Sequence, residues 1–321
     1  MVSFSFKNVF IDKYYTVASM DEANGNCKNI DYVIPSYDNY EKTFEQAEIS
    51  INKMVLDFFN NNYDIVIGGD LQNQICASSY ANKNNNKSFL GVYNACATFN
   101  EALIVMGSLI DSKKVRNGLV ITSSHKLVSE KTFRYPVEYG GPKLRKSTST
   151  STGSVGCILT SNKTKIKIIN ATIGSVVDMG ISDALNMGAV MAPACVDTFI
   201  NHLNDFNIDP SYYDVILTGD LGEVGSNIFN YILNSKYNIK LKNHIDAGSI
   251  MYKENQGFNS GASGPVTLPL ILFGNILSNK KYKKILLLAT GALHSSCLVN
   301  QKLDIPSICH AVSLEVNNDL N

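Results

Sequence analysis

The sequence predicts an α/β fold built from two duplicated halves, and two internal repeats carry this prediction. Residues 63–71, YDIVIGGDL, return as residues 213–221, YDVILTGDL, with five of nine positions identical. Residues 107–114, GSLIDSKK, return as residues 274–281, GNILSNKK, in the same order along the chain. Each copy of the second repeat follows an apolar helical pattern and precedes an apolar strand pattern. A strand–helix–strand unit repeated in this way indicates a duplicated α/β domain rather than a solenoid.

The length and composition allow two halves of ordinary domain size, which we place at residues 1–165 and 166–321. The chain has 321 residues, 45% of them hydrophobic and 17% charged, which is enough for a core in each half. Its 28 basic and 28 acidic residues balance, so we predict that it does not bind nucleic acid. The seven cysteines are scattered without a C-x-x-C pair. A reducing compartment is therefore expected, without a disulfide framework or a zinc ribbon.

Hydrophobic periodicity defines the elements of the first half. Residues 44–60 carry apolar side chains at helical spacing, which predicts an amphipathic helix that ends at a run of asparagines. Residues 98–110 are apolar on more than one face, which predicts a mostly buried helix. The predicted strands cover residues 8–11, 15–18, 64–68, 89–93, 118–122 and 155–159, and the strand at residues 89–93 is expected to be buried.

The second half is expected to continue the alternation of strands and helices. The Ser/Thr run at residues 147–152 directly precedes an apolar strand, so we predict an extended segment inside the fold. Pro193 predicts the start of a helix that runs to Phe206, after a loop at residues 178–191. The remaining predicted strands cover residues 165–172, 215–218 and 285–289.

Cys96 lies in a short turn, Asn94 to Ala97, between a predicted strand and a predicted helix. Unpaired amides and the helix dipole at such a position favour a thiolate. The alternative is a small buried hydrophobic residue, which is the usual role of a free cysteine. The second repeat has an offset of 167 residues, which places Cys96 opposite Ser263 at another strand-to-helix turn. If the two turns meet near a pseudo-twofold axis, both helix N-termini border one pocket, which favours a functional role.

Longer motifs resemble a known superfamily. A strand, a small-residue turn with a cysteine and a buried helix, inside a duplicated half, resemble the thiolase and ketoacyl synthase superfamily, and LLLATGALHSS resembles its final Gly-rich strand. The segments GVYNACAT, SSHKLVSEKTFRYPVEYGG, ATIGSVVDMGISDALNMGAVMAPA, TGDLGEVGS and IPSICHAVSLE closely resemble the stage V sporulation protein AD family. The resemblance covers nearly the whole chain. It implies a thiolase-like five-layer αβαβα fold and the binding of dipicolinic acid, pyridine-2,6-dicarboxylate, during its uptake into the forming spore.

The sequence departs from that of a working condensing enzyme of the superfamily. Such enzymes pair the cysteine with a histidine and with an asparagine or a second histidine. The loop expected to hold the first partner, residues 220–224, reads DLGEV, and Phe258 stands at the asparagine position with Asn259 beside it. Without a basic partner a cysteine does not readily run acyl transfer and decarboxylation. We therefore expect Cys96 to be equivalent to the nucleophile without being catalytic.

Two other functions stay open at this point. The first is an active ketoacyl synthase III-like acyltransferase that uses Cys96. The second is a scaffold with a vestigial pocket that holds a membrane channel partner.

A site for an aromatic dicarboxylate needs cations or N–H donors for two carboxylates and a flat apolar slot for the ring. Arg134 offers a bidentate fork between two aromatic residues, and Lys143 is the second candidate. An ion pair with Glu130 or Glu138 would account for Arg134 equally well. A lone histidine after a strand more often forms hydrogen bonds than acts as a base. The expected ligand-binding residues are Cys96, His125, Arg134, Asn259, Ser260, Ser263 and His294.

The remaining expectations concern ions, partners and location. Asp220 and Glu223 would repel a dianion unless calcium accompanies it. The expected ligand is therefore either dipicolinic acid alone or its calcium salt. There is no EF-hand-type loop, and we predict no dedicated metal site and no cofactor. The N-terminus lacks the apolar core of a signal peptide, and no apolar run is long enough to span a bilayer. The resemblance implies a peripheral protein on the cytoplasmic face of the spore inner membrane. Its expected partners are other stage V sporulation membrane proteins, and superfamily members are usually homodimers.

Overall fold

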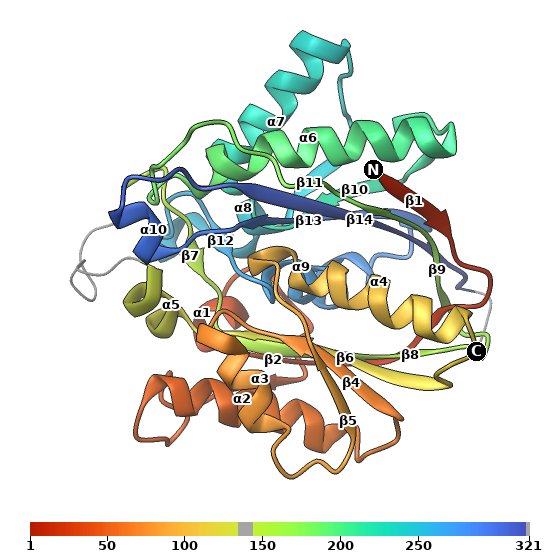
Figure 1. The fold of residues 1–321 in the computed structure, drawn as a ribbon, viewed down its shortest axis with the longest axis vertical. Coiled ribbons are helices and arrows are strands. Elements are labelled where there is room, and N and C mark those ends of the chain that lie inside the picture. The colour runs from red at the N-terminus through yellow and green to blue at the C-terminus, as the bar shows by residue number, and fades with distance from the viewer. Residues whose placement is uncertain (134–143, 319–321) are drawn as a thin grey trace.

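The computed structural model describes residues 1–133 and 144–318, in which strands and helices alternate (Figure 1). The strands are β1 (Val2–Ser5), β2 (Phe10–Ala18), β3 (Tyr32–Val33), β4 (Ile65–Gly69), β5 (Ser88–Gly91), β6 (Asn117–Ser124), β7 (Ser149–Thr150), β8 (Gly153–Thr160), β9 (Ile166–Ile173), β10 (Val215–Thr218), β11 (His244–Asp246), β12 (Ala262–Ser263), β13 (Lys284–Ala292) and β14 (Ser307–Val316). The helices are α1 (Met20–Ala23), α2 (Phe44–Phe58), α3 (Cys76–Ala81), α4 (Thr98–Asp111), α5 (Lys126–Phe133), α6 (Met187–Phe206), α7 (Gly222–Tyr237), α8 (Ala247–Met251), α9 (Thr267–Ile271) and α10 (Ser296–Asn300).

Two sets of five strands with the same order form most of the 12-stranded sheet, to which β1 is added beside β9 and β3 beside β2. One set runs β5-β4-β6-β8-β2 and the other runs β11-β10-β13-β14-β9. In each set the strand from the first repeat, β4 or β10, is parallel to both of its neighbours. The sets meet where β2 pairs with β9 in antiparallel orientation, at Phe10 and Ile11. The matching orders agree with a duplicated α/β fold, whereas the boundary between residues 165 and 166 stays a prediction.

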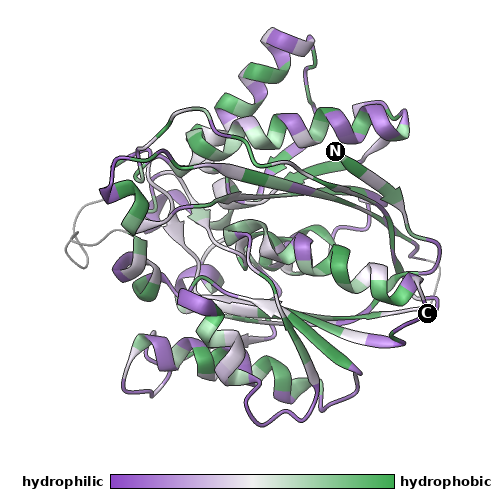
Figure 2. Cartoon of the chain, viewed as in Figure 1, coloured by the Kyte–Doolittle hydropathy of each residue, from purple (hydrophilic) through white to green (hydrophobic). Residues whose placement is uncertain are grey.

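Five layers follow from this sheet. Helices α2 and α3 cover the outer face of the first set, α6 and α7 cover the outer face of the second, and α4 and α9 lie between the sets (Figure 1). Three apolar clusters fill the interfaces between these layers. Along β13, Leu287 belongs to the central cluster, whereas Leu286 and Leu288 belong to the α6–α7 cluster. A strand covered on both faces is apolar at consecutive positions, and Figure 2 shows such hydrophobic strands at the centre of the fold.

Most predicted elements are present, and the Ser/Thr run is an extended, buried segment that contains β7. Residues 8–11 and 15–18 were expected to be separate strands, and this expectation is wrong. Residues 8 and 9 precede the single strand β2, whereas residues 10–11 and 15–18 both belong to it, with a register irregularity between Ile11 and Lys13 against β8. The exposed residues between them, which resemble a turn in sequence, lie on this continuous strand.

Two further expectations are corrected. The strand before Cys96 is not buried, because β5 is an edge strand that pairs only with β4 and is largely exposed. Helix α6 begins at Met187, and Pro193 lies inside it rather than at its start. The additional turns are apolar, since Val190, Met191 and Ala192 are buried against the second set of strands. Burial of this face outweighs the local cost of a proline within the helix.

Candidate functional site

Cys96 lies in a 3₁₀ turn, Ala95–Ala97, that joins the end of β5 to α4. The turn is fixed by a hydrogen bond of 2.6 Å from Thr98 Oγ1 to the Ala95 carbonyl oxygen, and by one of 3.0 Å from Asn94 N to Thr98 Oγ1. Ala95 has φ of 50°, a left-handed conformation that is uncommon for a residue with a Cβ. Gly291 on β13 lets the turn approach closely, because a Cβ there would lie 2.3 Å from the Asn94 carbonyl oxygen.

The partner of Cys96 is a carboxylate from the other half. Asp220 follows β10, is 1% exposed, and acts on the Cys96 thiol through its charge. It accepts hydrogen bonds from Thr290 Oγ1 at 2.6 Å and from Gly264 N at 3.4 Å. Burial raises the pKa of Asp220 to about 7, against the lowering effect of these donors.

The loop that holds Asp220 is organised by a second buried acid, Asp246. Its carboxylate accepts hydrogen bonds from Leu221 N at 3.1 Å and from Gly222 N at 2.9 Å. Gly222 has φ of 65°, and a Cβ there would lie 2.5 Å from the Ser260 carbonyl oxygen, so the loop is closely packed. Burial raises the pKa of Asp246, and its charge raises that of Asp220.

The environment of Cys96 keeps its sulfur protonated. Desolvation of the half-buried Cys96, followed by the charge of Asp220, raises the pKa of the thiol well above its usual value. The expectation that the start of α4 favours a thiolate is therefore wrong. A helix terminus contributes only about 0.3–1 kcal/mol at such a position. Desolvation and a neighbouring carboxylate, both of which oppose ionisation of a thiol, are larger effects here.

A small cavity of about 60 Å³ lies between the two halves and beside Cys96. It brings together three of the expected ligand residues, namely Cys96, Ser263 at the end of β12 and His294 after β13. The other residues that line it are Leu71, Ala95, Ser129, Phe133, Thr150, Met187, Met191 and Ala292. An open cleft of about 890 Å³ shares Leu71, Phe133 and His294 with this cavity, so the two adjoin.

Other expected ligand residues lie elsewhere. Asn259 is exposed, and Ser260 is buried under the loop after Asp220, where its carbonyl oxygen accepts a 2.9 Å bond from Glu223 N. Neither lines the cavity. Arg134 and Lys143 fall outside the described residues. Roles in ligand binding for these four residues remain predictions.

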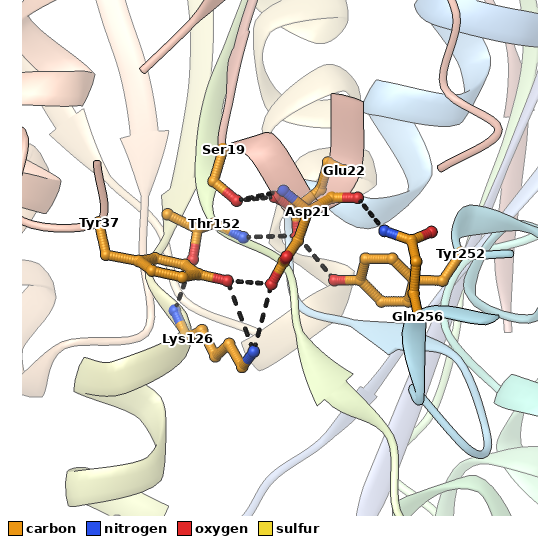
Figure 3. A network of polar contacts seen from close by, with 8 residues as sticks. All are labelled: Ser19, Asp21, Glu22, Tyr37, Lys126, Thr152, Tyr252 and Gln256. Atoms are coloured by element: carbon orange, nitrogen blue, oxygen red, sulfur yellow. Dashed lines mark hydrogen bonds and ion pairs between the residues drawn. The ribbon is translucent and has the colours of Figure 1, made fainter. Parts of the chain in front are cut away.

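His125 is also outside the cavity and lies beside a polar network that joins the halves. Its Nε2 lies 2.8 Å from the Tyr37 carbonyl oxygen, and its ring stacks on Phe44. Figure 3 shows the neighbouring network, in which Glu22 of α1 accepts bonds from Ser19 Oγ at 2.5 Å and from Tyr252 Oη at 2.6 Å. Burial lowers the pKa of His125, which fits a structural histidine better than a cation for ligand binding.

Two features of the site were not recognised in the sequence. One is the contact of Asp220 with Cys96, although the absence of a histidine from this loop was a usable signal. The other is Ser129 on α5, which is 4% exposed and whose Oγ has no hydrogen-bond partner among the described residues. Ser129 carries no motif of its own, and only the packing of α5 brings it to the cavity.

Metal and membrane features are quickly stated. Within residues 1–133 and 144–318, no group of three or more His, Cys, Asp or Glu side chains is arranged to hold a metal ion. In the same part of the chain, no helix has the length and apolar character required to span a bilayer.

Comparisons with known structures show the fold. The structure resembles 3-oxoacyl-[acyl-carrier-protein] synthase III from Aquifex aeolicus VF5, with a TM-score of 0.57 and 16% identity over 96% of this chain and 99% of that one. It also resembles cerulenin-bound OleA from Xanthomonas campestris, with a TM-score of 0.59 and 14% identity over 97% of this chain and 100% of that one. These likenesses confirm the predicted thiolase-like fold.

Comparisons at the level of sequence show the family. The family model described as Stage V sporulation protein AD (SpoVAD) matches residues 2–315. The Stage V sporulation protein AD of Bacillus subtilis (strain 168) is 34% identical over 319 residues, which cover 96% of this chain and 94% of that protein. The chain therefore belongs to the stage V sporulation protein AD family.

Proposed function

We propose that this chain binds dipicolinic acid, alone or as its calcium salt, between its two halves, and that it has lost condensing activity. The observation that carries the proposal is the buried hydroxyl of Ser129, which has no partner among the described residues and lines the cavity beside Cys96. A buried donor without an acceptor is costly, and a ligand carboxylate would satisfy it. Leu71 and Phe133 supply apolar surface for a flat ring.

The size and charge of the cavity define how such a ligand would lie. A volume of about 60 Å³ is far below the roughly 300–1,000 Å³ typical of ligand sites, so the ligand would extend into the adjoining cleft. One carboxylate would then lie near Ser129 and Ser263. The other would lie toward His294 and the predicted cations Arg134 and Lys143. Ionised Asp220 behind Cys96 would oppose the dianion, which favours binding with calcium or with Asp220 protonated.

The loss of condensation follows from the partner of Cys96. A nucleophilic thiol needs a base that accepts its proton, and a thiol whose pKa is raised by desolvation and by a nearby carboxylate stays in its unreactive form. The alternative is a ketoacyl synthase III-like acyltransferase. One observation supports it, because Cys96 lies in the turn directly before the buried helix α4, as expected for a nucleophile. It would require Asp220 to act as the base.

The location and partners form part of the proposal. A protein that moves dipicolinic acid into the spore would lie on the cytoplasmic face of the spore inner membrane, next to other stage V sporulation membrane proteins. A homodimer is also proposed, because the exposed edge of β5 leaves backbone groups available for pairing with a second copy.

A cavity-filling variant tests the proposed site. Ala292, which is 8% exposed, lines the cavity at the end of β13, and Ala292→Met would fill the space while Ala292→Ser would keep it open. We expect equilibrium dialysis with dipicolinate to show binding in the wild type and in Ala292→Ser but not in Ala292→Met. Ser129→Ala should weaken binding by roughly 10- to 100-fold, as for the loss of a hydrogen bond to a charged group. Unchanged binding in a folded Ala292→Met protein would place the ligand elsewhere.

A further inference from the structure

Two lysine-rich segments that lie far apart in the sequence meet at one end of the large sheet. They are residues 163–167, KTKIK, at the start of β9, and residues 280–284, KKYKK, at the start of β13. The end of β14 joins them, because Glu315 pairs in register with Lys167 on one side and Lys284 on the other. Backbone bonds extend this junction, from Val316 N to the Lys283 carbonyl oxygen and from Asn317 N to the Lys165 carbonyl oxygen.

We call the seven lysines of these segments the lysine face: Lys163, Lys165, Lys167, Lys280, Lys281, Lys283 and Lys284. Five of them line a groove of about 330 Å³ together with Glu315, which is the only acid in this lining among residues 1–133 and 144–318. The nearby carboxylate of Asp214 is occupied, since it accepts bonds from the backbone N–H groups of Lys283 and Lys284 at 2.8 Å each. Among the described residues, none of the seven ammonium groups is paired with a carboxylate. A chain with no net charge therefore carries a concentrated positive surface.

The lysine face lies at the opposite end of the molecule from the Cys96 cavity. Strand β13 begins at Lys284 in the groove and ends at Ala292 in the cavity wall. A strand of nine residues spans about 30 Å. A surface bound to the lysine face would consequently leave the cavity and its cleft open on the far side.

We propose, building on the membrane location proposed above, that the lysine face docks this protein on a membrane surface that contains anionic lipid headgroups. All seven cations are lysines, whose strongly hydrated point charges suit diffuse attraction to a charged surface rather than forked recognition of one phosphate or base. The groove is open, and its other polar side chains do not form a closed binding site: Thr164 already donates to the Ile11 carbonyl oxygen at 2.7 Å, and Asn318 to that of Lys280 at 3.4 Å. Within the part of the chain that the structure describes, the groove is lined by no exposed large apolar side chain that could insert into a bilayer. Docking is therefore electrostatic, reversible and sensitive to salt.

The matched pair of variants for the test removes equal charge at different places. One carries Lys163→Gln, Lys165→Gln, Lys167→Gln and Lys283→Gln within the lysine face. The control carries Lys53→Gln, Lys83→Gln, Lys240→Gln and Lys242→Gln, four exposed lysines that form no ion pair with a described residue and lie outside the groove. Both proteins must keep the melting transition of the wild type.

Cosedimentation with vesicles provides the measurement. We expect the wild type to bind vesicles of phosphatidylcholine with 30% phosphatidylglycerol at 50 mM salt. The lysine-face variant should bind them more weakly, on the order of fivefold for each lysine that it has lost. The wild type should not bind pure phosphatidylcholine vesicles, and 500 mM salt should abolish binding. Equal losses in the two variants, equal binding to both kinds of vesicle, or binding to a DNA duplex or to inorganic pyrophosphate in preference to anionic vesicles would overturn the proposal.

Discussion

The buried carboxylate of Asp220, from the other half of the chain, raises the pKa of the Cys96 thiol through its negative charge. The pair lies where the turn before α4 meets the loop after β10, and Thr290 and Gly264 hold the carboxylate in place. A carboxylate in contact with a thiol stabilises the protonated sulfur, whereas a neighbouring cation would favour the thiolate.

The first prediction concerns the reactivity of Cys96. Replacing Asp220 by asparagine removes the negative charge beside the sulfur, so the pKa of Cys96 should fall in Asp220→Asn. Alkylation by iodoacetamide at pH 8 should then be faster at Cys96, by about tenfold for each pKa unit of the decrease. Mass spectrometry would locate the label, with the exposed Cys297 as the internal reference.

The control for this experiment is Asp70→Asn. Asp70 occupies the equivalent position in the first repeat, is buried, and accepts bonds from the backbone N–H groups of Gln72 and Ser78. It should leave the alkylation rate of Cys96 unchanged. Equal rates in the wild type and Asp220→Asn would mean that Asp220 does not control the thiol.

The second prediction concerns pH and stability. The pKa of Asp220 is raised from 3.8 to about 7, so the folded protein binds this proton more tightly than the unfolded chain does. Its contribution to stability is complete below about pH 4 and is lost as the pH rises through 7, by up to about 1.4 kcal/mol per pH unit. In Asp220→Asn this contribution is absent.

Urea denaturation at several pH values would measure this effect. The free energy of unfolding of Asp220→Asn, relative to the wild type, should rise between pH 5 and pH 8. Taking the difference between the two proteins removes the opposite contribution of the buried histidines His202, His244 and His310, whose pKa values are lowered to about 4. A difference that does not change with pH would show that Asp220 is ionised throughout.

The third prediction is the absence of condensation. Incubation with acetyl-CoA and malonyl-CoA should give no product, because the loop after Thr218 supplies Asp220 rather than a histidine. Chromatography with radiolabelled substrate would detect low turnover. A condensation product that is lost in Cys96→Ser would support the acyltransferase alternative instead.

The fourth prediction concerns the network in Figure 3. Tyr252→Phe removes one of the donors to the buried Glu22 carboxylate and should lower the free energy of unfolding by about 1–3 kcal/mol at pH 7. The loss should be smaller at pH 4, where a protonated Glu22 needs fewer donors. Tyr231→Phe is the matched control, because Tyr231 is 70% exposed and its hydroxyl is not part of this network. Similar losses in both variants would rule out a stabilising role for the network.

The sequence predicted the fold well because the first repeat forms central strands, where burial on both faces produces apolar runs, and the second repeat covers the ends of buried helices in both halves. Strand β4 and strand β10, for example, are recognisable as related because each is enclosed by neighbours. Predictions failed where local pattern and long-range packing disagree. The exposed residues within β2 resemble a turn, and Pro193 resembles a helix start, but pairing with β8 and packing of α6 decide the outcome.

The candidate site could be predicted only in part. Cys96, Ser263 and His294 were identified because each stands beside the end of a strand in a duplicated fold, and these ends meet at one cavity. The protonation of Cys96 depends on Asp220, a contact across 124 residues of sequence that no local pattern reports. Ser129 reaches the cavity only through the packing of α5, and a serine has no periodicity that would indicate it.

Isothermal titration calorimetry tests the central claim most directly. The wild-type protein would be titrated with dipicolinate, with its calcium salt and, in a separate experiment, with acetyl-CoA. We predict saturable heat with dipicolinate or its calcium salt, lost in Ala292→Met and retained in Ala292→Ser, and no saturable heat with acetyl-CoA. Saturable binding of acetyl-CoA without binding of either form of dipicolinate would contradict the account.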